Sequence, residues 1–425
     1  MNSSTAQPRM KYLNIVSIFP TLTETFVLRE LRAMRQMGCD VMIGQLRPIG
    51  RRPAALGFDD LNSCVVRAKV VSWATLVGLV FFALKKPTAF WSNLKVVLSA
   101  IPDITNTVKL LYILCASTEL AYRFRQTGIM HVRGHHLHSE AVSAMFIGGL
   151  LDVPYSFTCH TVKTYYPNKV VVEVVRRARF IIASIIQVRG FLYSLGATGS
   201  QVYLIRNGVC LSQFPMRVSE PTPEPPVILA VGRLDYKKGF HVLLSACAIL
   251  RDESVSFRCV IVGNGEEWSD LSLRRRTLGL EKQVEMTGSL DFENVQGWYE
   301  RATLVVVPSV VGPDGATDGL PTVIIEAFFR GVPVAASATA GIPEVIQNGV
   351  NGFVVAAGSA RELANRMREL LSNRDLRRKF ALEARHTAER YFDLDRNAQC
   401  LSELMSGQVA ELGSETTPVL VSSAS

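Results

Sequence analysis

The sequence predicts an α/β protein with two halves of similar size, each built as a doubly wound parallel sheet. Short runs that are apolar throughout, such as Val227–Val231 and Leu304–Val307, alternate with longer segments of helical periodicity. Continuous apolar runs are typical of parallel strands that helices cover on both faces. The stretch Ser219–Val227 contains four prolines, which cannot lie in a helix interior, so it predicts an extended linker. With 425 residues, the chain is long enough for a sizeable core in each half.

The first half is predicted to open with the strand Tyr12–Phe19 and a helix near Glu24–Met37. Apolar residues recur through that helix at three- and four-residue spacing, and Gly38 follows it as a stop signal. Three further strands are expected in this half: Asp40–Ile43, Tyr155–Thr158 and Phe180–Ala183.

Residues 65–125 are expected to form an apolar helical insertion whose packing the sequence leaves open. Val70–Leu84 is shorter than the stretch of roughly 20 residues that spans a bilayer, and Leu94–Leu114 is interrupted by a proline and charged residues. Neither is therefore expected to cross a membrane. Two interpretations stay open: helices of the core or of an interface, or an amphipathic surface on a membrane, where flanking basic residues meet anionic lipid.

The second half is predicted to continue the alternation of strand and helix. Its expected strands are Val227–Val231, Phe257–Val262, Val284–Met286, Leu304–Val307 and Val332–Ala335. Its expected helices are Gly239–Leu250, Glu266–Leu278, Val295–Arg301 and Pro321–Arg330. The domains that follow are an N-terminal domain over residues 1–218, a linker over 219–227, a C-terminal domain over 228–392, a helix over 393–410 and a disordered tail over 411–425.

The charge and the cysteines restrict the class of partner and the compartment. The formal net charge of +9 favours an anionic partner such as a membrane surface or a phosphorylated substrate, although a basic surface without a partner also fits it. The basic clusters lack interleaved aromatic residues and match no RNA or DNA motif, so no nucleic acid is expected as a partner. The eight cysteines form no CxxC pair, which argues against zinc and suits buried thiols in the cytoplasm.

The segment Asp318–Glu326, DGLPTVIIE, combines two carboxylates with a predicted helix start. The helix is expected to begin near Leu320, since Pro321 suits a first turn, where a missing N–H costs little. The carboxylates are eight residues apart, slightly more than two helical turns, so they are expected on the same side. The open N–H groups of a helix start bind anions, and a neighbouring carboxylate can hold sugar hydroxyls. The segment therefore suits a nucleotide-sugar.

Further candidate residues lie where the predicted strands of the second half end. Gly232, Arg233 and Lys238 follow the first strand, Asn264 follows the second, and Gly288 follows the third. The carboxyl ends of parallel strands meet at one edge of a sheet, where open α/β sheets bind ligands. Arginine can fork two oxygens and lysine adds a compact charge, so the first loop suits a pyrophosphate. The glycines do not follow the GxGxxG pattern, which argues against a nicotinamide cofactor.

Together these segments resemble the nucleotide-sugar half of glycosyltransferase family 4. The resemblance rests on GRLDYKKG, VGNGEE, TGSL, VVPS, DGLPTVIIEAFFRGVPVAAS and GIPEVIQNGVNGFVV. Near the N-terminus, FPTLTETFVLREL resembles the subgroup that builds bacterial exopolysaccharides such as colanic acid and amylovoran. The resemblance covers roughly residues 12–60 and 130–400. It implies a GT-B fold, in which two Rossmann-like domains face a central cleft and a last helix crosses back to the first domain.

The resemblance also implies roles for residues of the second half. Arg233 and Lys238 would hold the donor diphosphate, and Glu326 would bind the ribose diol. Asp318 and the backbone of Gly319 would contact the transferred sugar. The donor-binding set that it implies is Gly232, Arg233, Lys238, Asn264, Gly288, Gly319, Leu320 and Glu326. The family retains anomeric configuration and uses no metal held by acidic residues, so no cofactor beyond the nucleoside-diphosphate-sugar substrate is expected.

Asp318 departs from the family pattern, which has Glu at this position. Asp is one methylene shorter, so its carboxylate lies about 1 Å further back, and such a misplacement can cost about 10²-fold in rate. Asp318 could select a different donor, act through a shifted loop, or weaken activity. Asp314, in the same glycine-rich loop, could substitute for it.

Five of the seven histidines fall within residues 131–160. A metal site is one interpretation, but the spacings match no ligand template, and roles in a core or loop are more common. By resemblance, His160 would bind a hydroxyl of the donor sugar or orient the acceptor, and His136 is the second family histidine of this region. The candidates are therefore, for catalysis, His160, Asp318 and Glu326 and, on the acceptor side, Thr23, Glu24 and His136, with Glu24 as a base.

The function predicted from these residues is retaining transfer of a sugar to a lipid-linked oligosaccharide or another glycan in cell-surface polysaccharide biosynthesis. The apolar insertion and the basic charge favour a peripheral position on the inner face of the cytoplasmic membrane. Two alternatives stay open. One is a glycosyltransferase-like scaffold subunit that binds nucleotide without turnover, and the other is an enzyme that acts on a small soluble acceptor.

Overall fold

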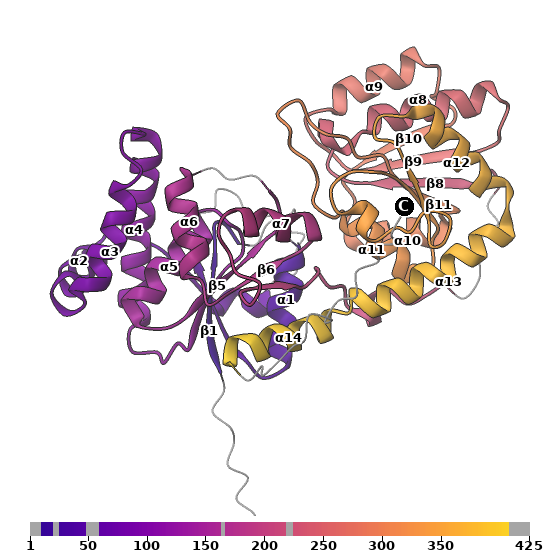
Figure 1. The fold of residues 1–425 in the computed structure, drawn as a ribbon. Helices are drawn as coiled ribbons and strands as arrows, with labels where there is room; N and C mark the ends of the chain where they lie inside the picture. Colours follow the sequence, from indigo (N-terminus) through magenta and orange to yellow (C-terminus); the bar gives the residue numbers. More distant parts are fainter. Residues whose placement is uncertain (1–9, 20–24, 48–58, 163–165, 218–223, 408–425) are drawn as a thin grey trace, which may run out of the picture. The chain divides into compact units, whose positions relative to one another are not determined.

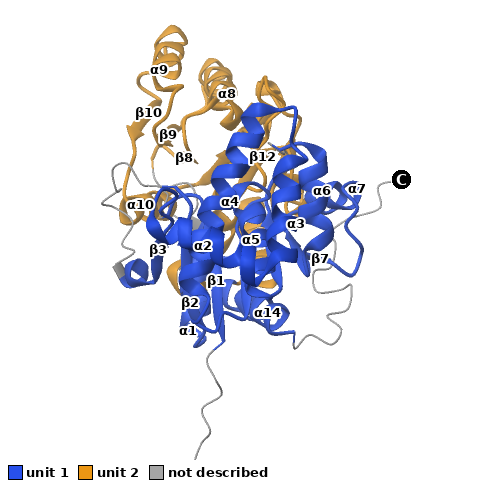
Figure 2. Ribbon diagram, turned by 90° about the vertical axis from the view of Figure 1, so that its left-hand side faces the viewer, with its two compact units in different colours: residues 1–208, 394–416 blue, residues 209–393, 417–425 orange. Residues whose placement is uncertain are grey.

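The computed structural model describes residues 10–19, 25–47, 59–162, 166–217 and 224–407. Within these ranges the chain forms two compact units, which Figure 2 distinguishes by colour. Unit 1 runs to Gly208 and resumes at Leu394, and unit 2 extends from Val209 to Asp393. Each unit contains one parallel sheet, so the two predicted Rossmann-like sheets are confirmed.

The boundary between the units differs from the predicted one at residue 218. Phe214 is fully buried in the core of unit 2. The Arg217 guanidinium donates hydrogen bonds to two backbone carbonyl oxygens of the same unit, at 2.6 and 3.0 Å. The apolar packing of Phe214 and the hydrogen bonds of Arg217 therefore assign residues 214–217 to unit 2. Of the predicted linker, residues 219–223 lie outside the described ranges, and Val227 is already part of a strand.

Unit 1 is built on a seven-stranded parallel sheet in the order β3-β2-β1-β4-β5-β6-β7. Its strands are β1 (Lys11–Val16), β2 (Asp40–Gln45), β3 (Val65–Arg67), β4 (His131–Gly134), β5 (Tyr155–Cys159), β6 (Phe180–Ala183) and β7 (Val202–Leu204). The strand order reverses between β1 and β4, which are hydrogen-bonded neighbours. The carboxyl ends of these two strands therefore form a topological switch point, where open α/β sheets bind ligands.

Helices cover the sheet of unit 1 (Figure 1). They are α1 (Thr25–Gln36), α2 (Trp73–Lys85), α3 (Pro87–Leu98), α4 (Ile104–Phe124), α5 (Ser139–Leu151), α6 (Asn168–Arg177) and α7 (Ile186–Ser194), with a 3-10 turn η2 (Asp59–Cys64). Nearly all of α5 is buried, because α4, β4 and β5 pack around it. This packing explains why its sequence is apolar on every face.

The predicted insertion over residues 65–125 is in part the crossover connection of the sheet. Its first segment is β3, and the second half of α4 is buried against α5 on the way to β4. Helices α2 and α3 pack on α4 beside it, at the left of Figure 1. None of the described helices combines the length and the apolar character that crossing a membrane requires.

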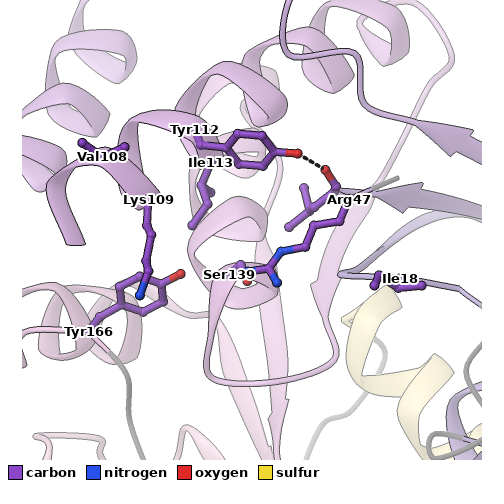
Figure 3. Close-up of a pocket in the computed structure, with 9 residues that line it drawn as sticks. Ile18, Arg47, Val108, Lys109, Tyr112, Ile113, Ser139 and Tyr166 are labelled. Carbon is purple, nitrogen blue, oxygen red and sulfur yellow. Dashed lines mark hydrogen bonds between the residues drawn. The ribbon is translucent and has the colours of Figure 1, made fainter. Parts of the chain in front are cut away.

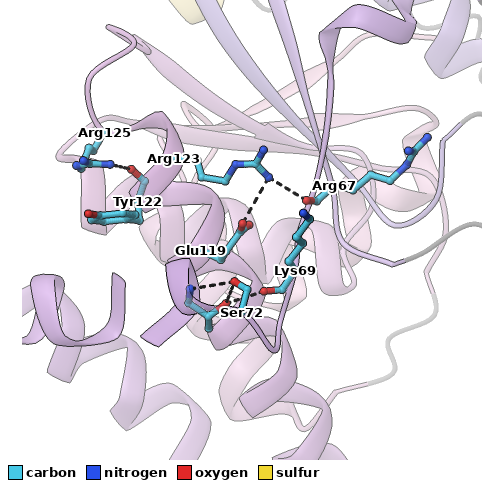
Figure 4. A network of polar contacts seen from close by, with 8 residues as sticks. Arg67, Lys69, Ser72, Glu119, Tyr122, Arg123 and Arg125 are labelled. Carbon is cyan, nitrogen blue, oxygen red and sulfur yellow. Dashed lines mark hydrogen bonds and ion pairs between the residues drawn. The ribbon is translucent and has the colours of Figure 1, made fainter. Parts of the chain in front are cut away.

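A polar network ties the start of α2 to α4 (Figure 4). Glu119 of α4 is buried, and its Oε1 lies 3.4 Å from Nη1 of Arg123. The same Nη1 donates to the carbonyl oxygen of Arg67 at 3.1 Å. Thr75 Oγ1 donates to the carbonyl oxygen of Lys69 at 2.6 Å. Burial raises the pKa of Glu119, while the positive charge of Arg123 lowers it. The connection from β3 to α2 is thereby fixed to the crossover helix.

Helix α14 (Leu394–Ser406) returns to unit 1 after the whole of unit 2. It packs against α1, and Tyr12 Oη of β1 donates to the carbonyl oxygen of Ser402 at 3.4 Å. Asn397 Nδ2 donates to the carbonyl oxygen of Arg206 at 2.8 Å. Unit 1 is therefore completed by a distant part of the chain. The predicted tail lies outside the described ranges.

Unit 2 is built on a six-stranded parallel sheet in the order β10-β9-β8-β11-β12-β13. Its strands are β8 (Val227–Val231), β9 (Arg258–Val262), β10 (Val284–Gly288), β11 (Leu304–Val307), β12 (Val334–Ser337) and β13 (Phe353–Val355). Its helices are α8 (Phe240–Asp252), α9 (Trp268–Thr277), α10 (Phe292–Arg301), α11 (Thr322–Arg330), α12 (Ala360–Ser372) and α13 (Arg374–Tyr391), with 3-10 turns η3 (Leu211–Gln213), η4 (Tyr236–Lys238) and η5 (Ile342–Glu344). Alternate residues of β8 join two apolar clusters, Ile228 and Ala230 in one and Val227 and Leu229 in the other. The sheet is therefore buried on both faces.

Candidate functional site

The loops that follow β8, β9 and β10 are joined by backbone hydrogen bonds at the carboxyl edge of the unit 2 sheet. The N–H of Gly232 donates to the last carbonyl oxygen of β9 at 3.0 Å. The N–H of Leu234 donates to the carbonyl oxygen of Asn264 at 3.0 Å, and that of Gly263 donates to Gly288 at 2.9 Å. These bonds bring together three residues that the sequence predicts only as separate strand ends, namely Gly232, Asn264 and Gly288.

Two glycines allow these loops to approach so closely. Gly239 has φ +69°, and a Cβ there would lie 1.9 Å from the carbonyl oxygen of Pro308. Gly263 has φ +145°, and a Cβ there would lie 1.8 Å from the carbonyl oxygen of Gly232. L-residues rarely adopt these φ values, and neither oxygen can move without its strand. The loops after β8, β9 and β11 are therefore interlocked.

Asp318 forms ion pairs with two lysines of the β8 loop. Nζ of Lys238 lies 2.5 Å from Oδ2, and Nζ of Lys237 lies 3.3 Å from Oδ1. The Asp318 side chain is only 12% exposed, so solvent screens the pairs less than it screens a surface ion pair. Lys238 and Asp318 are predicted from the sequence for different parts of the donor, and the structure brings them into contact. Lys237 is not among the residues predicted from the sequence, although it directly precedes Lys238 in the same loop.

Arg233 is held within its own loop by Asp235. Its Nε and Nη2 donate to Oδ2 of Asp235 at 3.0 and 2.8 Å. Asp235 is nearly buried, whereas the Arg233 side chain is 57% exposed. Nη1 takes no part in these two bonds. A fixed and exposed guanidinium is suited to an anion, because less rotamer freedom is lost on binding.

Glu326 lies on α11 and is directed by a buried tyrosine. Its Oε2 accepts a hydrogen bond from Tyr299 Oη at 3.1 Å. Tyr299, on α10, is fully buried, so the direction of its hydroxyl is fixed by packing. Tyr299 is therefore a positioning residue for the carboxylate. The sequence does not reveal it, since a buried tyrosine in an amphipathic helix looks like an ordinary core residue.

Helix α11 begins at Thr322, two residues after the predicted start. Pro321 has an extended ψ of 123° and forms the N-cap, so the helix can begin only after it. Two residues before Pro321, the carbonyl oxygen of Gly319 accepts the backbone N–H of Gly341, which follows β12, at 3.0 Å. Leu320 packs against one of the two apolar clusters of unit 2. Asp314, the predicted substitute for Asp318, accepts the backbone N–H of Ala316 at 3.1 Å and so is engaged by its own loop.

In unit 1, histidines gather at the carboxyl ends of β4 and β5. The ring centroids of His136 and His160 are 5.0 Å apart, and the ring of Phe26 from α1 lies 4.7 Å from that of His160. Both ring nitrogens of His160 are buried and make no hydrogen bond to any described residue. We refer to His135, His136 and His160 as the histidine cluster. His131 lies apart from it inside β4, where its Nε2 is 2.8 Å from Ser156 Oγ.

The environment of the histidine cluster keeps its buried imidazoles neutral. Burial lowers the pKa of His160 well below its ordinary value of 6.5, and the nearby His136 and Arg133 lower it further. Burial likewise lowers the pKa of His135, followed by the charge of Arg133. Arg133 is buried on β4 and forms an ion pair with Glu30 of α1, with Nη2 3.1 Å from Oε2. Neutral imidazoles can donate or accept hydrogen bonds at physiological pH.

The remaining predicted site residues of unit 1, Thr23 and Glu24, lie outside the described ranges. Among the described residues, no group of three or more His, Cys, Asp or Glu side chains is arranged to hold a metal ion. The interpretation of the histidines as a metal site therefore has no support in this part of the chain.

Residues 213–387 match the family model described as Glycosyl transferases group 1. This range contains every residue predicted for donor binding. WcaL of Escherichia coli (strain K12), a relative named for colanic acid biosynthesis, is 34% identical over 178 residues. The amylovoran biosynthesis glycosyltransferase AmsK of Erwinia amylovora is 31% identical over 173 residues. The predicted resemblance to this subgroup is confirmed.

The matched segments span less than half of each relative. They cover 42% of this chain and 44% of WcaL, and 41% of this chain and 42% of AmsK. A crystal structure of Alr3699/HepE of Anabaena in complex with UDP-glucose covers 94% of this chain and 100% of that chain, with 18% identity and a TM-score of 0.71. This likeness extends over both units and confirms the predicted fold class. The chain therefore has a GT-B fold, and unit 2 contains the segment that matches the glycosyl transferases group 1 model.

Proposed function

We propose that the protein is a retaining glycosyltransferase that moves a sugar from a nucleoside-diphosphate-sugar to a lipid-linked oligosaccharide or another glycan. The observation that carries this proposal is the arrangement of Arg233, Lys238, Asp318 and Glu326 on two loops and on helix α11 at the carboxyl edge of the unit 2 sheet, within the segment that matches the glycosyl transferases group 1 model. The names of WcaL and AmsK support an acceptor in exopolysaccharide biosynthesis, and the UDP-glucose in the Anabaena structure supports the class of donor.

The donor is proposed to bind along the carboxyl edge of the unit 2 sheet. Arg233 and Lys238 hold the diphosphate and neutralise the charge that develops on it as it leaves, so no metal ion is required. Glu326 binds the ribose hydroxyls. When the diphosphate binds Lys238, Asp318 is released from its ion pair with that lysine. Its carboxylate and the backbone of Gly319 then contact the sugar.

His160 is proposed to bind a hydroxyl of the transferred sugar as a neutral imidazole. Its buried ring nitrogens make no hydrogen bond within the described residues, and a ligand hydroxyl would satisfy one of them. Its lowered pKa suits this role better than that of a proton donor in the cationic form. His136, beside it in the histidine cluster, is proposed to face the acceptor.

The acceptor side is proposed to work at the inner face of the cytoplasmic membrane through α2, α3 and α4. Residues 61–102 contain five Lys or Arg residues and no Asp or Glu. On this segment Val71, Trp73, Leu84 and Trp91 are 99, 77, 74 and 55% exposed. Exposed tryptophans beside lysines are typical of helices that lie in the interface of an anionic membrane. A lipid-linked acceptor is available at such a surface.

A subunit that binds nucleotide without turnover is the second candidate. The ion pair between Asp318 and Lys238 favours it, because the carboxylate proposed for the sugar is engaged by the lysine proposed for the diphosphate. The two candidates differ in turnover and not in nucleotide binding.

Binding and hydrolysis of UDP-, GDP- and ADP-sugars test the proposal. We expect one donor to bind saturably and to be hydrolysed slowly, and Lys238→Ala to weaken its binding at least about tenfold, because a charge-assisted hydrogen bond is lost. Lys379→Ala, an exposed lysine on α13, is the matched control. Binding without hydrolysis or transfer would favour the second candidate, and folded protein that binds no donor would contradict both.

A further inference from the structure

An apolar cavity of about 480 Å³ lies in unit 1 at the carboxyl ends of β1 and β2 (Figure 3). Its walls come from α4, from the residues that follow the two strands, and from the start of α5. Tyr112 Oη of α4 donates to the carbonyl oxygen of Leu46 at 2.8 Å, which fixes one wall. We call it the α4 pocket, and its lining includes Leu46, Arg47, Val108, Lys109, Ile113 and Tyr166.

Two cations reach into this otherwise apolar space. In Figure 3, Arg47 extends toward Ser139 and Lys109 extends toward Tyr166. Neither forms an ion pair with a carboxylate among the described residues. Burial raises the pKa of Tyr166, against a hydrogen bond with Ser139 that lowers it, and the nearby Glu140 adds to the rise. The phenol of Tyr166 keeps its proton and is engaged with Ser139. The pocket therefore offers two positive charges to an anion.

A stripe of exposed apolar residues continues from the pocket along α4. Ile104, Val108 and Leu111 are 78, 61 and 49% exposed. Their spacing of four and then three positions puts them on one face of the helix. Val108 also lines the α4 pocket. The apolar wall of the pocket is therefore continuous with an apolar surface on the outside of unit 1.

We propose that the α4 pocket binds the phosphate-bearing end of a lipid, namely the lipid phosphate of the acceptor. Phosphate oxygens accept hydrogen bonds from Arg47 and Lys109, the first carbons of the chain contact Leu46 and Ile113, and the chain continues past Val108 along the stripe. A free phosphate would not use the apolar walls, and an uncharged lipid would not use the two cations. The inference rests on the proposed function in one respect, that the acceptor is lipid-linked.

The position of the pocket suits an acceptor. Ile18, which also lines it, follows β1, and β1 is hydrogen-bonded to β4. The N–H of His135, just after β4, donates to the carbonyl oxygen of Ile15 at 3.3 Å. The α4 pocket and the histidine cluster therefore lie at neighbouring strand ends of the same sheet edge. A sugar attached to the bound phosphate can extend from the pocket toward His136, which we assign to the acceptor, and His160, which we assign to the transferred sugar.

Calorimetric titration of the full chain with farnesyl phosphate, farnesol and inorganic phosphate tests the inference, with the lipids kept below their critical micelle concentrations. We expect saturable binding of farnesyl phosphate, and binding of farnesol and of inorganic phosphate at least about tenfold weaker. The double variant Arg47→Gln with Lys109→Gln should lose at least about tenfold in affinity for farnesyl phosphate. Val108→Trp, at an exposed position that tolerates a larger side chain, should weaken binding by filling the pocket.

Lys95→Gln is the matched control, because Lys95 is an exposed lysine on α3 outside the pocket. Equal affinity for farnesyl phosphate in the wild type and in both pocket variants would overturn the inference. Inorganic phosphate that binds as tightly as farnesyl phosphate would overturn its lipid part. Donor titration of the same samples separates the two proposals. A wild-type protein that binds no donor refutes the proposed function alone. Pocket variants whose affinity for farnesyl phosphate is unchanged refute the pocket alone.

Discussion

At the scale of single residues, the carboxylate of Asp318 forms ion pairs with Lys238, which we assign to the diphosphate, and with its neighbour Lys237. Asp318→Asn removes its charge and keeps its shape. We expect UDP to bind about two- to tenfold more tightly, because Lys237 and Lys238 lose a competing carboxylate. Donor hydrolysis should fall about 10²-fold, because the proposed sugar contact is lost. Calorimetry with UDP and a hydrolysis assay measure the two effects.

Asp314→Asn is the matched control for this prediction, since the Asp314 carboxylate is engaged by the N–H of Ala316 in its own loop. It should leave the affinity for UDP unchanged. Weaker binding of UDP to Asp318→Asn than to the wild type would show that the carboxylate supports the diphosphate and does not compete with it.

The neutral histidines of unit 1 make its stability depend on pH. Burial lowers the pKa of His131 to about 3 and that of His135 well below 6.5. In the unfolded chain both titrate near 6.5, so the unfolded state binds protons first as the pH falls. The stability that is present above pH 6.5 is lost below it, by about 1.4 kcal/mol per pH unit for each histidine. Urea unfolding at pH 7.5, 6.5 and 5.5 measures this loss.

His131→Gln isolates one of these groups, because glutamine does not titrate. It should reduce the pH dependence below 6.5 by about 1.4 kcal/mol per pH unit. Glu119 acts in the opposite direction, since burial raises its pKa and its protonation favours the folded state as the pH falls. Glu119 is present in both proteins, so its effect cancels in the comparison. An unchanged slope would contradict the neutral state assigned to His131.

At the scale of elements, the interlocked loops of unit 2 predict that one methyl group disrupts the carboxyl edge. In Gly263→Ala the new Cβ would lie 1.8 Å from the carbonyl oxygen of Gly232, at a φ of +145°. We expect unit 2 to lose about 3 kcal/mol of unfolding free energy and the protein to lose nucleotide binding. Denaturant unfolding and UDP titration measure both.

Gly297→Ala is the comparison for this substitution. Gly297 lies within α10, and a Cβ there has open space around it. Alanine should therefore raise helix stability by about 0.5–1 kcal/mol and leave UDP binding unchanged. If Gly263→Ala bound UDP like the wild type, the close packing of the loops would not be what forms the site.

The sequence predicts best those helices and strands whose residues fit only one kind of secondary structure. Leu304–Val307 is observed with its predicted bounds, because four consecutive buried β-branched or leucine side chains suit a covered parallel strand. Helices α12 and α13 are missed, since their charged sequences bury few residues. The sequence indicates where these two helices begin through their N-cap residues, Ser359 and Asn373. The side chains of these residues accept hydrogen bonds from the backbone N–H groups of Glu362 and Leu376.

Single residues of the site can be predicted from the sequence, but the contacts between them cannot. Glycines and charges at strand ends mark Gly232, Arg233 and Lys238 because local chemistry alone makes them suitable. The bond from Tyr299 to Glu326 joins residues 27 positions apart on two helices, and only packing brings them together. The ion pair between Lys238 and Asp318 likewise depends on the neighbouring positions of β8 and β11 in the sheet.

At the scale of the whole molecule, the exposed apolar residues of α2 and α3 predict binding to anionic membranes. Substituting both Trp73→Ser and Trp91→Ser should weaken binding to phosphatidylglycerol vesicles at least about tenfold, because two large side chains no longer enter the interface. Neutral vesicles should bind the wild type less tightly, since the lysines then lack an anionic partner. Vesicle sedimentation measures both effects.

Leu382→Ser is the control, because Leu382 is 48% exposed on α13 in unit 2. It should not change vesicle binding. Membrane binding that is equal in the double variant and the wild type would remove α2 and α3 as the membrane surface, and the two tryptophans would then require another partner.

The return of α14 to unit 1 has a consequence for synthesis on the ribosome. Unit 2 is continuous in the chain, but unit 1 lacks its last helix until residues 394–406 have emerged. At ordinary translation rates, about 10–40 s separate the appearance of Gly208 from that of α14. During that interval the nascent N-terminal half exposes the apolar face of α1 that α14 later covers. Unit 2 can thus fold first, and a chaperone has a defined period in which to protect the incomplete unit 1.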